Sequence, residues 1–157
     1  VNNIMGFPDE TRELIFDSIE LNRLIGTDSV NAYIFQPYRG SAMFDDALSR
    51  GYIEADSPTN SPILGSVLTM PSITQDELLG LVRTFSLYVK FPREEWPDIA
   101  MAEKFTPEGD AMFKKLSERY YERFFDHDFK WTKKACISTR IYDGPVVDKQ
   151  STEIITG

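Results

Sequence analysis

The chain has 157 residues, of which 41% are hydrophobic and 13% aromatic. This is enough for one globular domain with its own core, and it argues against an extensively disordered chain. The formal net charge of -8 and the pI near 4.7 argue against nucleic-acid binding, because phosphate contacts need Lys and Arg gathered on one face. The short basic run of Lys130, Lys133 and Lys134 does not reverse this balance.

Two further features of the sequence predict the cellular compartment of the protein. No apolar run approaches the roughly 18 residues of a membrane helix, and no signal-peptide pattern is present in this sequence. The single cysteine, Cys136, cannot form an internal disulfide, which agrees with a reducing environment. We therefore expect a cytoplasmic protein in which Cys136 is a small buried residue.

The chain opens with a predicted strand, a turn and a helix. Gly6 permits a backbone conformation closed to other residues, and Pro8 is expected just ahead of an acidic first helical turn. Such a turn lets a ligand approach closely, and it is also the form of an ordinary βα turn. Gly26 is placed to end the helix in the left-handed conformation. The apolar positions at helical spacing are Leu14, Ile15, Ile19, Leu21 and Ile25.

A second strand is predicted from Val30 to Phe35, stopped by Pro37. Strand, helix and strand in this order form a right-handed parallel unit. Because two parallel strands cannot bury both of their faces, we expect further strands upstream. Ser41 to Arg50 is predicted to be a short helix closed by Gly51.

The next segment begins with a polar loop from Glu54 to Pro62, and residues 54–73 as a whole are predicted to be a linker loop. Thr74-Gln75-Asp76-Glu77 is a capping box that begins a helix ending before Pro92. Trp96 and Pro97 open a short helix through about Phe105.

Thr106-Pro107-Glu108 begins a last helix, which is expected to reach about Phe125. We expect residues 74–129 to form a helical extension, with Thr74 to Phe125 as an autonomous core, and residues 130–157 to form an irregular or short β tail. The aromatic positions of the last helix are predicted to be core residues: Phe113, Tyr120, Tyr121, Phe124 and Phe125.

Two motifs stand at the ends of the two predicted strands. Ile4-Met5-Gly6-Phe7-Pro8-Asp9-Glu10-Thr11 resembles the I-x-G-x-P-x-E-T signature after the fifth barrel strand of radical SAM enzymes, particularly the Fe-S oxidoreductase group that often carries a cobalamin-binding domain. Pro37-Tyr38-Arg39-Gly40-Ser41-Ala42-Met43 resembles the P-x-x-G-[ST]-x-[LM] loop after that family's sixth strand. The resemblance covers residues 1–53. It implies an α/β fold class: the last two strands of a partial TIM-like (β/α)6 radical SAM barrel, followed by a mainly helical C-terminal extension.

The resemblance also implies an activity and its cofactors. The complete enzyme would use a four-iron four-sulfur cluster to cleave S-adenosylmethionine to a 5′-deoxyadenosyl radical, and some members also bind cobalamin. The family's cluster is held by a C-x-x-x-C-x-x-C loop, whereas this sequence has one cysteine. The resemblance therefore implies the C-terminal part of a longer enzyme, inactive alone, whose partner is the upstream part of its own chain and whose substrate is not indicated.

Site residues are implied by the same resemblance, in which the strand ends touch the adenine and ribose side of the cofactor. Ile4 would pack on adenine, Gly6 would allow close approach, and Glu10 would brace the turn. Three residues after the second strand would line the neighbouring edge. The implied cofactor-binding residues are Ile4, Gly6, Phe7, Pro8, Glu10, Gln36, Pro37 and Tyr38.

Other patterns leave alternatives open. Asp126-His127-Asp128 could suggest a metal site or a general base, but a helix C-terminus also accounts for a lone histidine. Glu94-Glu95 and Asp45-Asp46 are paired carboxylates, although adjacent helical residues point apart. Tyr38-Arg39-Gly40-Ser41 could hold an anion before a helix. The alternatives are thus a phosphate-binding or other small-ligand α/β module, and a non-catalytic helical interaction or regulatory domain.

Overall fold

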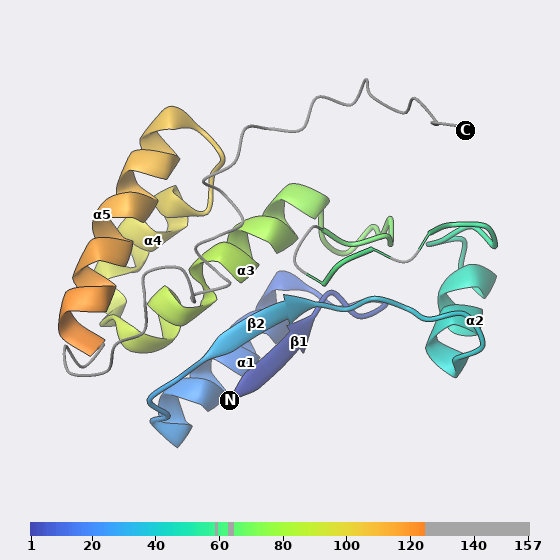
Figure 1. The fold of residues 1–157 in the computed structure, drawn as a ribbon, viewed down its shortest axis with the longest axis horizontal. Coiled ribbons are helices and arrows are strands. Elements are labelled where there is room, and N and C mark those ends of the chain that lie inside the picture. Colours follow the sequence, from blue (N-terminus) through green and yellow to red (C-terminus); the bar gives the residue numbers. More distant parts are fainter. Residues whose placement is uncertain (59, 63–64, 125–157) are drawn as a thin grey trace, which may run out of the picture.

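The computed structural model of the chain describes residues 1–58, 60–62 and 65–124 (Figure 1). The described residues form a helix-rich arrangement with a two-stranded parallel sheet. The expected tail, Cys136, and Asp126-His127-Asp128 lie outside the described residues. The elements are β1 (Asn2–Met5), α1 (Arg12–Ile25), β2 (Asn31–Ile34), α2 (Ala42–Ser49), α3 (Gln75–Lys90), the 3-10 turn η1 (Arg93–Glu95), α4 (Trp96–Ala102) and α5 (Pro107–Phe124).

The sheet has one covered face and one open face. β1 and β2 pair in parallel, with Ile4 opposite Tyr33 and Met5 opposite Ile34. Because successive side chains point to opposite faces, Met5 and Ile34 share the face that packs on α1, and both are buried. Ile4 lies on the other face and is 56% exposed. Within the described part of the chain β1 pairs with β2 alone, so its outer edge carries no strand.

The first helix begins and ends with side-chain and backbone caps. Thr11 accepts a hydrogen bond from the N–H of Leu14, and Gly26 ends the helix at φ 67° as predicted. The expected position of Pro8 just ahead of the first helical turn is wrong. Asp9 and Glu10 remain in the turn, and α1 begins only at Arg12.

One hydrophobic core joins the βα unit to the helices that follow. α3 packs on both β2 and α1, and it also contacts α4 and α5. Met5, Ile19, Leu81, Phe85 and Tyr120 therefore belong to one cluster of buried side chains. The wide apolar face of α3 uses the sheet and α1 as part of its cover, so the helical segment shares its core with the βα unit. The greater stability expected for residues 74–125 stays a prediction.

The segment predicted as a linker, residues 54–73, packs against the end of β2. The N–H of Ile34 donates to the carbonyl of Pro62 at 2.8 Å, on the strand edge away from β1. Leu68 is fully buried in a second cluster with Phe44 and Ala47 of α2. The described residues of this segment therefore pack as a loop that covers one edge of the sheet.

The predicted helix starts in the second half of the chain are confirmed. Thr74 and Glu77 form the complete capping box of α3. The hydroxyl of Thr106 accepts a hydrogen bond from the N–H of Gly109 in the first turn of α5. α4 ends at Ala102, earlier than the expected Phe105, since the chain turns there to begin α5. The aromatic stripe of α5 packs on the core through Phe113, Tyr120 and Phe124.

Candidate functional site

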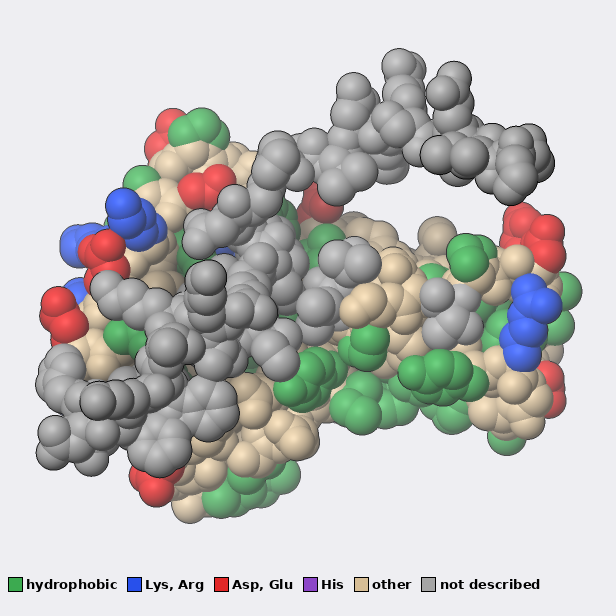
Figure 2. Space-filling view, viewed as in Figure 1, with side chains coloured by type: hydrophobic (Ala, Val, Ile, Leu, Met, Phe, Trp, Pro, Cys, Tyr) green, Lys and Arg blue, Asp and Glu red, His purple; other side chains and the backbone are tan. Residues whose placement is uncertain are grey.

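The candidate site lies where β1 and β2 end side by side. The N–H of Phe35 donates to the carbonyl of Met5 at 2.7 Å, which aligns the two exits. In parallel sheets ligands bind outside the carboxyl ends of strands. Figure 2 shows hydrophobic side chains (green) gathered below the centre of the view. In Figure 1 this is the region where the chain leaves the strands and runs toward α2. We call the residues after β1, Gly6 to Glu10, the β1 turn.

Glu10 holds the β1 turn from within. One of its carboxylate oxygens, Oε2, accepts hydrogen bonds from the N–H groups of Gly6 and of Phe7, the latter at 3.3 Å. The N–H of Glu10 in turn donates to the carbonyl of Phe7 at 3.0 Å. Burial raises the pKa of Glu10, and the two backbone hydrogen bonds oppose that shift. Glu10 therefore braces the turn, and the part in cofactor binding that the family resemblance implies for it stays a prediction.

Gly6 combines a left-handed backbone conformation with a close approach to α3. Its φ of 86° disfavours residues with a Cβ, and a Cβ placed there would lie 2.7 Å from Cδ2 of Leu78. The side that a Cβ would occupy is thus filled by the core. The expectation that glycine leaves this space for a ligand is corrected: the space belongs to Leu78.

An aromatic pair joins the two strand exits. The rings of Phe7 and Phe35 are stacked, with centroids 4.5 Å apart and planes at 27°. Ile4, near the end of β1, and Tyr38, after the end of β2, have exposed fractions of 56% and 62%. Sequence reasoning missed Phe35, although its place two residues after Tyr33 puts it on the open face by the strand period.

The three residues expected along the exit of β2 differ in exposure: Gln36, Pro37 and Tyr38. Gln36 is 5% exposed, and its Nε2 donates to the carbonyl of Gly65 at 2.8 Å. Its Oε1 is buried and has no hydrogen-bond donor among the described residues. Pro37 is buried as well, so Tyr38 alone presents an open surface.

The start of α2 is capped by its own residues. The hydroxyl of Ser41 accepts from the N–H of Phe44 at 3.2 Å and donates to the carbonyl of Tyr38 at 2.7 Å. Arg39 reaches the carbonyl of Ser57 at 3.5 Å. These contacts are those of a capped βα turn, and they take up groups that an anion would use.

The paired carboxylates do not share a site. Asp46 pairs with Nε of Arg50 at 2.9 Å, while Asp45 is exposed. Glu95 receives two hydrogen bonds from Arg119, at 2.6 and 3.1 Å, and its neighbour Glu94 is exposed. Each pair therefore consists of one ion-paired and one solvated group.

A polar cluster ties the β1 turn to the segment after α2. Asp9, at φ 62°, accepts a hydrogen bond from the hydroxyl of Tyr52 at 2.7 Å and forms an ion pair with Arg50. The hydrogen bond to Asp9 raises the pKa of Tyr52. We call Asp9, Arg50 and Tyr52 the Asp9 cluster. Sequence reasoning missed it, because Asp9 lies 41 residues before Arg50 and occupies a variable position of the motif from Ile4 to Thr11.

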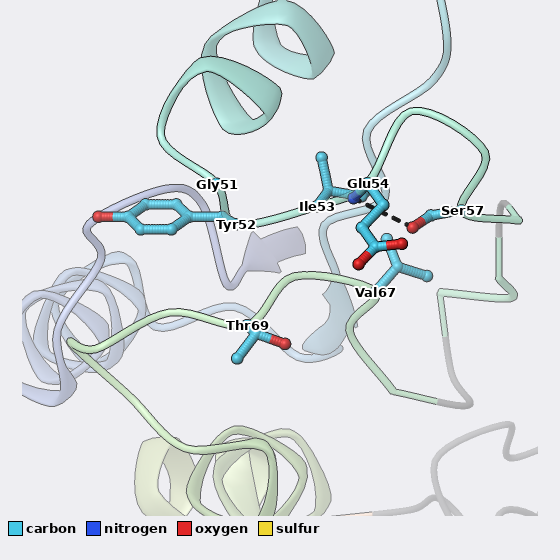
Figure 3. Close-up of a pocket in the computed structure, with 7 residues that line it drawn as sticks. All are labelled: Gly51, Tyr52, Ile53, Glu54, Ser57, Val67 and Thr69. Atoms are coloured by element: carbon cyan, nitrogen blue, oxygen red, sulfur yellow. Dashed lines mark hydrogen bonds between the residues drawn. The ribbon is translucent and has the colours of Figure 1, made fainter.

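Tyr52 also stands beside an open pocket of about 410 Å³. In Figure 3 its ring points away from Ile53 and Glu54, toward the β1 turn. The N–H of Glu54 donates to the hydroxyl of Ser57 at 3.2 Å across this pocket. None of the cofactor-binding residues implied by the resemblance lines it. The lining residues are Gly51, Tyr52, Ile53, Glu54, Ser57, Val67 and Thr69.

The described residues contain neither a cluster of metal ligands nor a helix that could cross a membrane. Across residues 1–58, 60–62 and 65–124, no group of three or more His, Cys, Asp or Glu side chains is placed to hold a metal ion. None of the helices in that part of the chain combines the length and apolar character that a bilayer crossing requires.

No protein-family model, curated protein or solved structure matches this chain.

Proposed function

We propose that this chain is the C-terminal part of a cytoplasmic radical SAM enzyme and that its strand ends contact the adenine side of S-adenosylmethionine. The observation that carries the proposal is the β1 turn. Its Gly6 and Phe7 amides are both held by Glu10, directly beside the exit of β2. This is the arrangement that the family motif implies for the fifth and sixth barrel strands.

The open side chains at this edge suit an adenine ring. Ile4 and the stacked pair of Phe7 and Phe35 offer flat, apolar surface, on which a heteroaromatic ring packs favourably. Tyr38 adds a polar rim through its exposed ring. The buried Oε1 of Gln36 could accept a hydrogen bond from a ligand donor. Gly6 contributes to the shape of the turn and not to ligand space.

The cofactors would supply the chemistry, and this chain would supply positioning. When bound, the four-iron four-sulfur cluster and S-adenosylmethionine provide the reductive cleavage to methionine and a 5′-deoxyadenosyl radical. Cluster ligands would come from outside this chain, because several thiolates are needed and the sequence holds one. A cobalamin domain, where the enzyme carries one, would also lie outside it.

The open edge of β1 supports a barrel that continues beyond this sequence. α1 turns Arg12 and Phe16 toward α3 and α4, where Arg12 pairs with Glu103 and Phe16 packs on Tyr88. The opposite flank of the helix carries an exposed apolar stripe, at the spacing i, i+7 and i+11. We call it the α1 stripe, and it consists of Leu14, Leu21 and Ile25.

The α1 stripe and the free edge of β1 lie on the same side of the βα unit. α3 covers the side of β2, so the flank of α1 away from α3 is the flank above the outer edge of β1. A preceding βα unit would pair its strand with β1 and pack its helix on the α1 stripe. One preceding βα unit of the same chain would therefore cover both the α1 stripe and the free edge of β1.

The proposal is tested on the longer protein that contains this sequence. It is reconstituted anaerobically with iron and sulfide, reduced, and assayed for 5′-deoxyadenosine formed from S-adenosylmethionine. We expect formation by the wild-type protein and strong loss with Ile4→Asp, which places a charge in the adenine site. Leu24→Asp is the matched control, because Leu24 is 84% exposed on α1. Absence of 5′-deoxyadenosine from a wild-type protein that holds its cluster would overturn the proposal.

A further inference from the structure

We infer that the Asp9 cluster positions the β1 turn for cofactor binding, in addition to Glu10. Asp9, Arg50 and Tyr52 would act through the turn and would not touch the cofactor. The inference rests on the proposed function, since it assigns a role in binding S-adenosylmethionine. It adds a second support to the turn, supplied by a distant segment of the chain.

Both oxygens of the Asp9 carboxylate are engaged by this distant segment. Oδ2 pairs with Nη1 of Arg50, 41 residues away, and Oδ1 accepts from Tyr52, 43 residues away, at 2.7 Å. Two donors on two oxygens fix the direction of the carboxylate as well as its position. The side chain of Asp9 is therefore tied at two points to the chain that follows α2.

The donors are themselves anchored. Nε of Arg50 pairs with Asp46 at 2.9 Å, and its backbone N–H donates to the carbonyl of the same residue at 3.1 Å. The N–H of Tyr52 donates to Ala47 at 2.9 Å, while its carbonyl accepts from Thr69 at 2.8 Å. The cluster thus connects the β1 turn to α2 and to the packed loop 54–73.

The backbone of the turn needs such support. Asp9 has φ 62°, and it is the one non-glycine residue with positive φ in the described part of the chain. Aspartate tolerates this conformation better than most residues, yet the conformation persists only where surrounding contacts specify it. Glu10 holds the amides of Gly6 and Phe7, and the Asp9 cluster holds the tip of the turn. In the chain, Phe7 and Pro8 therefore stand between Gly6, which Glu10 holds, and Asp9, which Arg50 and Tyr52 hold.

The cluster is poorly suited to a purely stabilising role. The side chains of Arg50 and Asp9 are 42% and 54% exposed, and exposed ion pairs contribute little to global stability. A contact of this kind can still select one local conformation of a turn. Its loss is expected to change cofactor affinity more than the melting temperature.

The test uses Asp9→Gly, Arg50→Ala and the double variant in the longer, reconstituted protein. Glycine adopts the positive φ without strain and removes the carboxylate, although it also gives the backbone more freedom. We expect each single variant to weaken S-adenosylmethionine binding by about fivefold or more, a typical coupling between two sites, with little change in melting temperature. The double variant should bind no more weakly than Asp9→Gly alone, because that substitution already removes the contacts of Asp9 with both Arg50 and Tyr52. Asp45→Ala, at an exposed aspartate of α2, is the matched control.

Two further variants separate positioning from general damage. Asp9→Asn keeps an acceptor for Tyr52 and should retain more affinity than Asp9→Gly, and Arg50→Lys should retain more than Arg50→Ala. Unchanged affinity in both single variants, or additive losses in the double variant, would overturn the inference and leave the proposed function intact. A wild-type protein that holds its cluster and does not bind S-adenosylmethionine would overturn the proposed function and this inference with it.

Discussion

Leu78 of α3 fills the space that a side chain at Gly6 would need. A Cβ on Gly6 would lie 2.7 Å from Cδ2 of Leu78, and Gly6 has φ 86°. We therefore expect Gly6→Ala to destabilise the chain through two separate effects. A left-handed conformation costs an ordinary residue about 1–2 kcal/mol, and overpacking adds roughly 1–3 kcal/mol.

Gly40→Ala separates these effects. Gly40 has φ 83°, but nothing lies within 4 Å of the Cβ position, so its substitution carries the backbone cost alone. Chemical denaturation of both variants gives the two free energies of unfolding. Equal losses for Gly6→Ala and Gly40→Ala would show that Leu78 does not constrain the β1 turn.

Tyr88 and Glu103 form a polar contact at the junction of α1, α3 and α4. The Tyr88 hydroxyl donates to Oε1 of Glu103, which also pairs with Arg12 at 2.7 Å. We expect Tyr88→Phe to lower the free energy of unfolding by about 1–2 kcal/mol, because it removes a hydrogen bond to a charged group. Tyr38→Phe, at an exposed tyrosine, is the control and should change stability little.

Burial and the hydrogen bond to Glu103 raise the pKa of Tyr88. The folded chain then keeps this proton where the unfolded chain releases it, above the ordinary tyrosine pKa of about 10. The stabilisation by the hydroxyl is complete below that pH and declines as the pH rises further. Denaturation of wild type and Tyr88→Phe should give converging stabilities above that pH. A difference that stays constant there would refute the pKa shift.

The α1 stripe distinguishes this chain alone from the longer protein. In the 157-residue chain Leu21 is 57% exposed, so Leu21→Ser should change stability by less than about 0.5 kcal/mol. In the longer protein the proposed neighbouring helix buries Leu21, and the same substitution should cost about 1.5–3 kcal/mol. Leu24→Ser should be neutral in both. Equal small effects of Leu21→Ser in the two contexts would argue against a neighbour on this flank.

Local signals made much of this fold predictable from the sequence. The Thr74 and Glu77 capping box, the Gly26 cap and the Thr106 start each depend on residues within one helical turn. Contacts between distant segments could not be predicted in this way. The shared core of Met5 and Leu81, the Gly6 contact with Leu78 and the Asp9 contact with Arg50 depend on tertiary packing. For the same reason the sequence does not predict that Gln36 is buried and donates to the carbonyl of Gly65.

The 157-residue chain alone is expected to assemble no iron-sulfur cluster. A four-iron cluster needs several thiolates, and Cys136 supplies one. Anaerobic incubation with iron and sulfide, followed by gel filtration and iron analysis, should leave the chain without stoichiometric iron. A stoichiometric cluster on this chain would contradict the assignment of the cluster ligands to another part of the protein.

The central claim is that the strand ends contact S-adenosylmethionine, and hydrogen exchange of the longer, reconstituted protein tests it most directly. With and without S-adenosylmethionine, exchange is followed in peptides that cover residues 1–11 and 33–41. We predict slower exchange in both peptides on cofactor binding and unchanged exchange in α5, which lies away from the site. Unchanged exchange in both peptides of a protein that calorimetry shows to bind S-adenosylmethionine would contradict the claim.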